Sequence, residues 1–120
     1  MSPRIGGFAN GGAPFCVPPG YVVQSKPPPA EALAFSKPAS AANLALEKRC
    51  VMRRWEGDGW CLGVIRSANS DKRYRVGGDY VNFWIRYDGE DKDVPHVLLS
   101  SQYATTSDAD FQSWCLLEER

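Results

Sequence analysis

The acidic residues between positions 88 and 93 are the densest group of side chains that could do chemistry. Asp88, Glu90, Asp91 and Asp93 fall within six positions directly after Tyr87. Carboxylate oxygens suit a hard cation, but the run lacks the twelve-residue loop and terminal Glu of a calcium-binding loop. We therefore interpret it as a solvated turn that concentrates negative charge, and we expect no metal there.

The cysteines and the single histidine form no pattern for catalysis or zinc binding. Separations of 34, 11 and 54 residues divide the four cysteines, Cys16, Cys50, Cys61 and Cys115. A zinc site needs about four nitrogen or sulfur ligands, usually in short paired spacings. His96 has no Ser or Cys that the sequence assigns to it as a nucleophile. We expect free thiols, no cofactor and a chain that is not an enzyme.

A basic group with an interleaved aromatic residue lies between positions 66 and 75. Its members are Arg66, Lys72, Arg73, Tyr74 and Arg75. Basic side chains contact phosphates and aromatic rings stack on bases, so the group supports a nucleic-acid interface. However, the chain has 14 Lys and Arg against 14 Asp and Glu, which gives no net charge to favour nucleic acid. A solvated hairpin tip explains the same residues.

Composition divides the chain into an extension and a domain. Residues 1–46 hold eight of the nine prolines, whereas residues 47–120 hold all four Trp and ten of the 14 aromatic residues. Proline and glycine oppose regular structure. We predict a disordered or loosely ordered Pro/Gly/Ala-rich extension over residues 1–45 and a domain over residues 46–120. The chain has no apolar run of membrane-spanning length and no signal-peptide pattern, so we expect an intracellular protein without membrane contact.

The domain has the pattern of short strands joined by tight turns. We predict strands over residues 49–55, 60–67, 80–87, 92–99 and 113–117, with one helical turn at 100–103. Pairing of the second and third strands about residue 72 would place Trp60 opposite Trp84, and the last strand would then pack over both. Closure removes the exposed edges of so small a sheet, so we predict an all-β, five-stranded antiparallel barrel with a C-terminal packing strand.

Three stretches, taken in order, resemble the Tudor family. They are residues 46–55, which end at Trp55, residues 59–65 (GWCLGVI) and residues 82–90 (NFWIRYDGE). In that family the first strand ends at an aromatic residue, a Gly- and Trp-containing strand follows, and the third strand ends in an aromatic residue and an Asp-Gly turn. The resemblance covers about residues 46–103 and implies a Tudor-like (Src-homology-3-like) barrel, of the group that includes chromo-barrel and Agenet domains.

The resemblance also implies a site for a cationic peptide. Many Tudor domains bind methylated Lys or Arg in an aromatic cage, a set of rings around the cation. By position, Trp55 and Tyr87 match the aromatic residues of the cage. Asp88 and Glu90 match acidic residues that contact the ammonium, while Cys61 stands where the second strand often has a Tyr. The candidate ligand-binding residues are Trp55, Cys61, Phe83, Tyr87, Asp88 and Glu90.

The expected function is therefore recognition of a Lys- or Arg-containing peptide, methylated or unmodified, as by a histone reader. Such barrels occur in chromatin proteins and in proteins of mobile elements, so the resemblance implies a monomeric module that is nuclear in a eukaryote. Two alternatives stay open. One is a nucleic-acid-binding barrel that uses residues 66–75, and the other is a structural protein–protein interaction module without a methyl cage.

Overall fold

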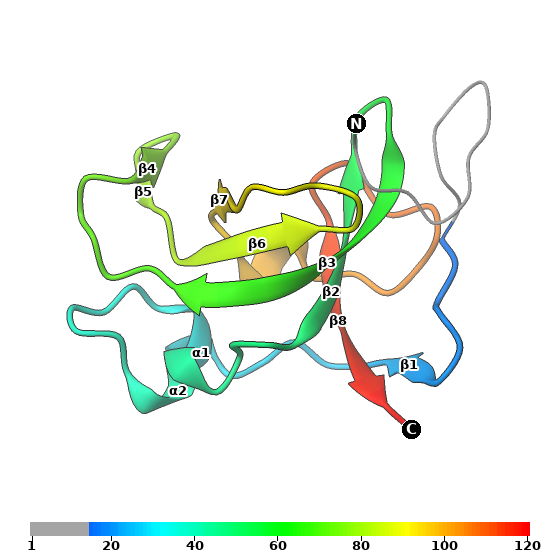
Figure 1. Ribbon diagram of the computed structural model, residues 1–120, viewed down its shortest axis with the longest axis horizontal. Helices are drawn as coiled ribbons and strands as arrows, with labels where there is room; N and C mark the ends of the chain where they lie inside the picture. Colours follow the sequence, from blue (N-terminus) through cyan, green and yellow to red (C-terminus); the bar gives the residue numbers. More distant parts are fainter. Residues whose placement is uncertain (1–14) are drawn as a thin grey trace.

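Six antiparallel strands form the main sheet of the computed structural model, in which residues 15–120 are described (Figure 1). Their order across the sheet is β1 (Tyr21–Val23), β8 (Trp114–Glu119), β2 (Cys50–Trp55), β3 (Gly59–Ala68), β6 (Phe83–Tyr87) and β7 (Val94–His96). The other elements are a hairpin of β4 (Arg75–Val76) and β5 (Asp79–Tyr80), the helices α1 (Ala30–Leu33) and α2 (Ala41–Leu44), and the 3-10 turn η1 (Ser100–Gln102). The predicted all-β class is confirmed, and β1 adds a strand that the sequence did not predict.

Alternating side chains give the sheet a buried core on each face. The first core contains buried residues of the four central strands, β8, β2, β3 and β6. They include Val51, Cys61, Ile65, Phe83, Ile85, Tyr87, Trp114 and Leu116. The second core, on the opposite face, consists of Met52, Trp60, Cys115 and Leu117. Successive residues of a strand point to opposite faces, which is why neighbours such as Trp114 and Cys115 lie in different cores.

The N-terminal segment forms a strand and two short helices between residues 21 and 44, which corrects the prediction of a disordered or loosely ordered extension for the described residues 15–45. β1 pairs with β8, with Tyr21 opposite Glu119. Phe15 packs edge-to-face on Trp60, with ring centroids 4.7 Å apart. The segment stays ordered because its apolar side chains cover the second core, which would otherwise face water. Residues 1–14 lie outside the described part of the chain.

Two buried amides attach the helical part of this segment to the rest of the fold. Asn43 donates from Nδ2 to the carbonyls of Ala32 (2.9 Å) and Ala34 (3.0 Å), which fixes α2 against α1. Asn82 donates from Nδ2 to the carbonyls of Leu33 and Leu98, each at 2.9 Å, and accepts from the Leu98 N–H at 2.8 Å. These bonds hold α1 over one end of the first core.

The pairing of β3 with β6 differs in register from the prediction. Gly63 lies opposite Tyr87 and Ile65 opposite Ile85, so the pairing centres near residue 75, and a bulge follows Ile65. Trp60 lies opposite Arg54 on β2 instead of opposite Trp84. The predicted turn at residue 72 was wrong because the connection is longer and contains its own hairpin, β4–β5, which lies outside the main sheet.

Gly63 lets β6 approach β3 closely, and this gives a first prediction. A Cβ at this position would lie 2.9 Å from the Arg86 carbonyl oxygen, 2.9 Å from Ile85 Cγ2 and 3.0 Å from Tyr87 Cδ1. We expect Gly63→Ala to lower the free energy of unfolding by about 1–3 kcal/mol through overpacking, measured by urea denaturation. Ser67→Ala on the same strand is the control, expected within about 0.5 kcal/mol of the wild type. Equal stability of the two variants would contradict the close contact.

Candidate functional site

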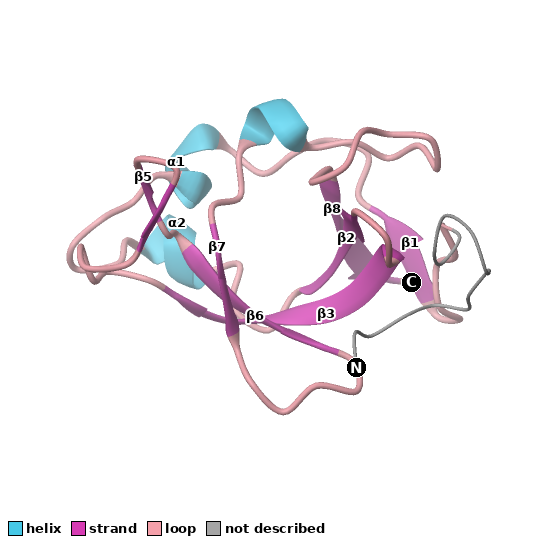
Figure 2. Cartoon of the chain, turned by 90° about the horizontal axis from the view of Figure 1, so that it is seen from above, coloured by secondary structure: helices cyan, strands magenta, loops and turns pink. Residues whose placement is uncertain are grey.

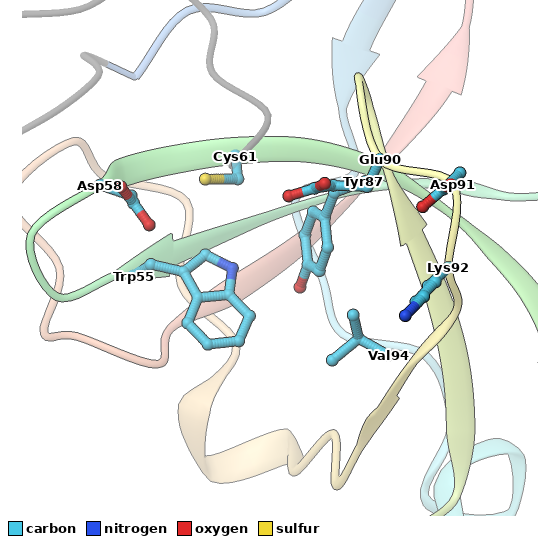
Figure 3. Close-up of a pocket in the computed structure, with 8 residues that line it drawn as sticks. All are labelled: Trp55, Asp58, Cys61, Tyr87, Glu90, Asp91, Lys92 and Val94. Carbon is cyan, nitrogen blue, oxygen red and sulfur yellow. The ribbon is translucent and has the colours of Figure 1, made fainter. Parts of the chain in front are cut away.

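Four of the six predicted ligand-binding residues line one pocket of about 360 Å3 (Figure 3). Trp55 comes from the end of β2, Cys61 from β3, Tyr87 from the end of β6 and Glu90 from the turn that follows. The remaining lining residues are Asp58, Asp91, Lys92 and Val94. We call this the first pocket. Its size is in the range of small-ligand sites.

The other two predicted residues lie outside the lining of the first pocket. Phe83 is fully buried in the first core, four positions from Tyr87 and so about 13 Å away along an extended strand. Asp88 is exposed, and its N–H donates to the Leu62 carbonyl at 3.0 Å. The turn continues through Gly89 with a φ of +83°, so that Glu90 rather than Asp88 reaches the pocket.

Sequence reasoning missed the contribution of the β2–β3 turn. Asp58 lies in that turn and lines the first pocket beside Trp55. The signal available in the sequence was its position three residues after the candidate aromatic residue, in a tight Gly-Asp-Gly turn. Val94 was also missed, because its alternation within the short strand β7 is interrupted by Pro95.

Trp55 and Tyr87 form two walls of the first pocket at a steep angle to each other. Their ring centroids are 5.7 Å apart and their planes meet at 75°. The Arg53 guanidinium carbon lies 4.6 Å from the centroid of the Trp55 ring. Arg53 lines a second pocket that Trp55 also lines, and it does not line the first. The guanidinium therefore stacks on the indole beside the second pocket and outside the lining of the first pocket.

The lining of the first pocket combines apolar walls with excess negative charge. Asp58, Glu90 and Asp91 contribute three carboxylates, whereas Lys92 contributes one ammonium. Cys61 and Val94 add the other apolar side chains of the lining; Figure 3 shows Cys61 above Trp55 and Val94 below Tyr87. Aromatic faces and carboxylates both stabilise a cation, so the lining favours a positively charged group with apolar surface.

A hydrogen-bonded chain joins the half-buried Arg53 to the buried side chains of His96 and Tyr87. Arg53 Nη1 lies 2.6 Å from His96 Nδ1, and His96 Nε2 lies 2.9 Å from the Tyr87 hydroxyl. An arginine can only donate, so Nδ1 is the acceptor, and the proton of the neutral imidazole sits on Nε2 and is donated to Tyr87. His96 and Tyr87 are each 3% exposed, which fixes the Tyr87 ring as a rigid wall.

Burial sets the protonation states in this chain. Burial, reinforced by the nearby Arg53 cation, lowers the pKa of His96 from 6.5 to about 3. Burial also raises the pKa of Tyr87 above its ordinary value. Neither group changes protonation near neutral pH, so these two side chains hold the pocket's shape rather than exchange protons with a ligand.

The three arginines of the nucleic-acid alternative contact other residues of the protein, whereas Lys72 is exposed. Arg73 donates to both carboxylate oxygens of Asp71, at 2.7–3.1 Å, and lowers the pKa of Asp71 to about 2. The guanidinium carbon of Arg75 lies 4.7 Å from the ring centroid of Tyr80. The remaining contacts in this group are a Tyr74–Trp84 ring pair at 4.9 Å and an Arg66–Asp93 ion pair at 3.7 Å. These contacts compete with phosphates and bases for the same side chains.

Residues 15–120 do not meet the requirements of a disulfide, a metal site or a membrane-spanning helix. All four cysteines are free thiols, and Cys61 and Cys115 are buried. Residues 15–120 contain no group of three or more His, Cys, Asp or Glu side chains that could hold a metal ion. Within the same residues, no helix is both long enough and apolar enough to span a lipid bilayer.

No family model, curated protein or solved structure matches the chain. The function is therefore inferred from the chemistry of the pocket and the elements that form it.

Proposed function

We propose that the chain is a non-catalytic binding module that recognises a Lys or Arg side chain within a peptide. The observation that carries this proposal is the first pocket, in which two aromatic walls at 75° meet a lining with three carboxylates and one ammonium. A cation with attached carbon groups satisfies both features, because it keeps its charge while its surface packs on the rings.

The same proposal takes the fold to be a Tudor-like barrel built from β8, β2, β3, β6 and β7. The strand order supports it, since these five strands are neighbours in the sheet and η1 lies between β7 and β8 in the chain. A parallel bridge from Tyr103 to Trp114, next to η1, further supports closure. Figure 2 shows the sheet curving, with β7 and β8 on opposite sides of the curve.

Methylation of the cation is expected to strengthen binding. The first pocket offers aromatic rings and a valine to the tip of the ligand, and these surfaces suit methyl groups better than a strongly hydrated ammonium. Because only two walls are aromatic, we expect modest affinity and a preference of about threefold to tenfold for trimethyl-lysine over unmodified lysine.

The test uses one peptide with lysine, trimethyl-lysine or acetyl-lysine at a single position, titrated calorimetrically. Acetylation removes the charge, so we expect binding in the order trimethyl-lysine, lysine, acetyl-lysine. Glu90→Gln should weaken trimethyl-lysine binding about threefold or more, because it removes one carboxylate from the lining. Glu118→Gln, an exposed position on β8, is the matched control.

Equal binding of the three peptides would contradict the proposal, as would an unchanged affinity of the Glu90→Gln variant. A parallel titration with single-stranded and duplex DNA tests the nucleic-acid alternative. Tight DNA binding that falls steeply with added salt would favour residues 66–75 as the interface instead.

A further inference from the structure

A second pocket of about 420 Å3 adjoins the first pocket at Trp55. Trp55 lines both pockets, and so the indole is their common wall. Arg53 and Trp55 of β2 line one part of the second pocket, and Val76, Gly77 and Asp79 of the β4–β5 hairpin line another. Pro95, Val97 and Leu99, from the chain after Val94, also line it. The two pockets are therefore adjacent parts of one surface that follows β7.

Exposed apolar side chains form the rim of the second pocket. Val76 is 52% exposed and Leu99 is 38% exposed, and both line it. Pro95 and Val97 add apolar surface between them. Large apolar side chains clustered at a concave surface are typical of a place where a partner's apolar group binds.

Aromatic contacts hold the hairpin wall of the second pocket in place. The Tyr80 ring of β5 stacks on Phe35 of the N-terminal segment, with centroids 4.5 Å apart and planes at 28°. Arg75 also packs on the Tyr80 ring, with its guanidinium carbon 4.7 Å from the ring centroid. The same guanidinium donates a hydrogen bond to the Gly78 carbonyl at 2.8 Å. Val76 is thus carried by an anchored turn, and the pocket exists before any ligand binds.

The two pockets differ in net charge, so they favour different side chains of a bound peptide. The first pocket has three carboxylates against one ammonium, whereas the second has Arg53 and Asp79, which balance. The Arg53 guanidinium also disfavours a second cation beside it. A cation is therefore favoured in the first pocket and a neutral apolar side chain in the second.

We propose that the second pocket binds an apolar side chain of the same peptide whose cation occupies the first pocket. This inference rests on the proposed function, and it adds a sequence requirement to it. Val94 lines the first pocket, and the apolar residues Pro95, Val97 and Leu99 line the second, one, three and five positions further along the chain, with Val97 as the middle of the three. An extended peptide beside this stretch advances by the same rise per residue, so its apolar residue lies about three positions from the cation.

The test is a set of peptides with trimethyl-lysine at one fixed position in a Gly/Ser background. A single Leu replaces Ser at each position from one to five on either side of the trimethyl-lysine. We expect affinity to rise about fivefold with Leu near three positions away on one side, because part of the leucine surface leaves water, and to stay flat elsewhere. A Leu peptide with acetyl-lysine should bind much more weakly.

Variants of the rim separate this inference from the proposed function. Val76→Ser with Leu99→Ser should abolish the gain from Leu while leaving the affinity for the Ser peptide unchanged. Leu44→Ser on α2, at a site 49% exposed and outside the lining of both pockets, is the matched control. All these side chains are at least one-third exposed, so the variants should fold.

The outcomes distinguish failure of the second-pocket inference from failure of the proposed function. If the trimethyl-lysine peptide binds but Leu adds nothing at any position, the second-pocket inference is overturned and the proposed function stands. If the gain persists in the rim variant, the apolar side chain binds elsewhere and the inference also fails. If no peptide binds, the proposed function fails, and the inference fails with it.

Discussion

Replacing Trp55 by alanine is expected to lower the affinity for a cationic peptide by about tenfold or more. Trp55 supplies one face to the first pocket and is the wall it shares with the second. The substitution also removes the ring on which Arg53 stacks at 4.6 Å, so the guanidinium would gain access to the first pocket and repel the ligand cation. Both effects act in the same direction.

The measurement is calorimetric titration with the trimethyl-lysine peptide, with urea denaturation to confirm folding. Trp55 is only partly buried, so a loss of stability of about 1–2 kcal/mol is expected. Phe111→Ala is a matched control, because Phe111 is 49% exposed and also carries an arginine, Arg54, 4.9 Å from its ring centroid. Full binding by the Trp55→Ala variant, or equal losses in both variants, would contradict the role of this wall.

Tyr87→Ala is a poorer test of the same wall, because Tyr87 is 3% exposed and belongs to the first core. Its removal would leave a cavity and cost about 3–5 kcal/mol of stability, so loss of binding could not be separated from unfolding.

Acid is expected to destabilise the protein through His96. In the folded state the pKa of His96 is about 3, against 6.5 for an ordinary histidine. The unfolded chain therefore binds this proton more tightly, and the stability is complete above pH 6.5 and is lost as the pH falls toward 3. Protonation would place a donor at Nδ1 against the Arg53 Nη1 donor, 2.6 Å away. The full loss amounts to about 5 kcal/mol.

The comparison is between the wild type and His96→Gln, with urea denaturation at several pH values from 7 to 4. Both proteins lose stability as carboxylates protonate, so the additional loss in the wild type reports His96. The chain has a single histidine, so its imidazole signals in an NMR spectrum are unambiguous and provide a second measurement that needs no variant. Titration of these signals near pH 6.5 in the folded protein would contradict the prediction.

The local parts of the fold could be predicted from the sequence. Phe83, Ile85 and Tyr87 share one face of β6 because residues two apart in a strand point the same way, and all three are buried in the first core. Trp55 and Glu90, which the Tudor resemblance implied as ligand-binding residues, both line the first pocket, and each lies at a turn that the sequence marks clearly. Strands and turns depend on neighbouring residues, so these predictions needed no knowledge of distant contacts.

The long-range parts could not be predicted in the same way. Phe15 and Tyr21 lie among prolines, and the surface that orders them, around Trp60, exists only after β2, β3 and β8 have assembled. The role of His96 depends on Arg53, which is 43 residues away in sequence and on a different strand. Neither pairing leaves a periodic signal, because contacts across a sheet are set by register rather than by spacing along the chain.

The pairing of β1 with β8 also determines how the protein responds to a pulling force. Gly20 accepts from the Arg120 N–H at 3.0 Å, so these two residues lie side by side at one end of an antiparallel pair. Tension applied between these two residues would break the hydrogen bonds between β1 and β8 one after another, from Tyr21 toward Val23. β1 would peel away at low force while the other strands stay paired, and the surface around Trp60 would be uncovered first.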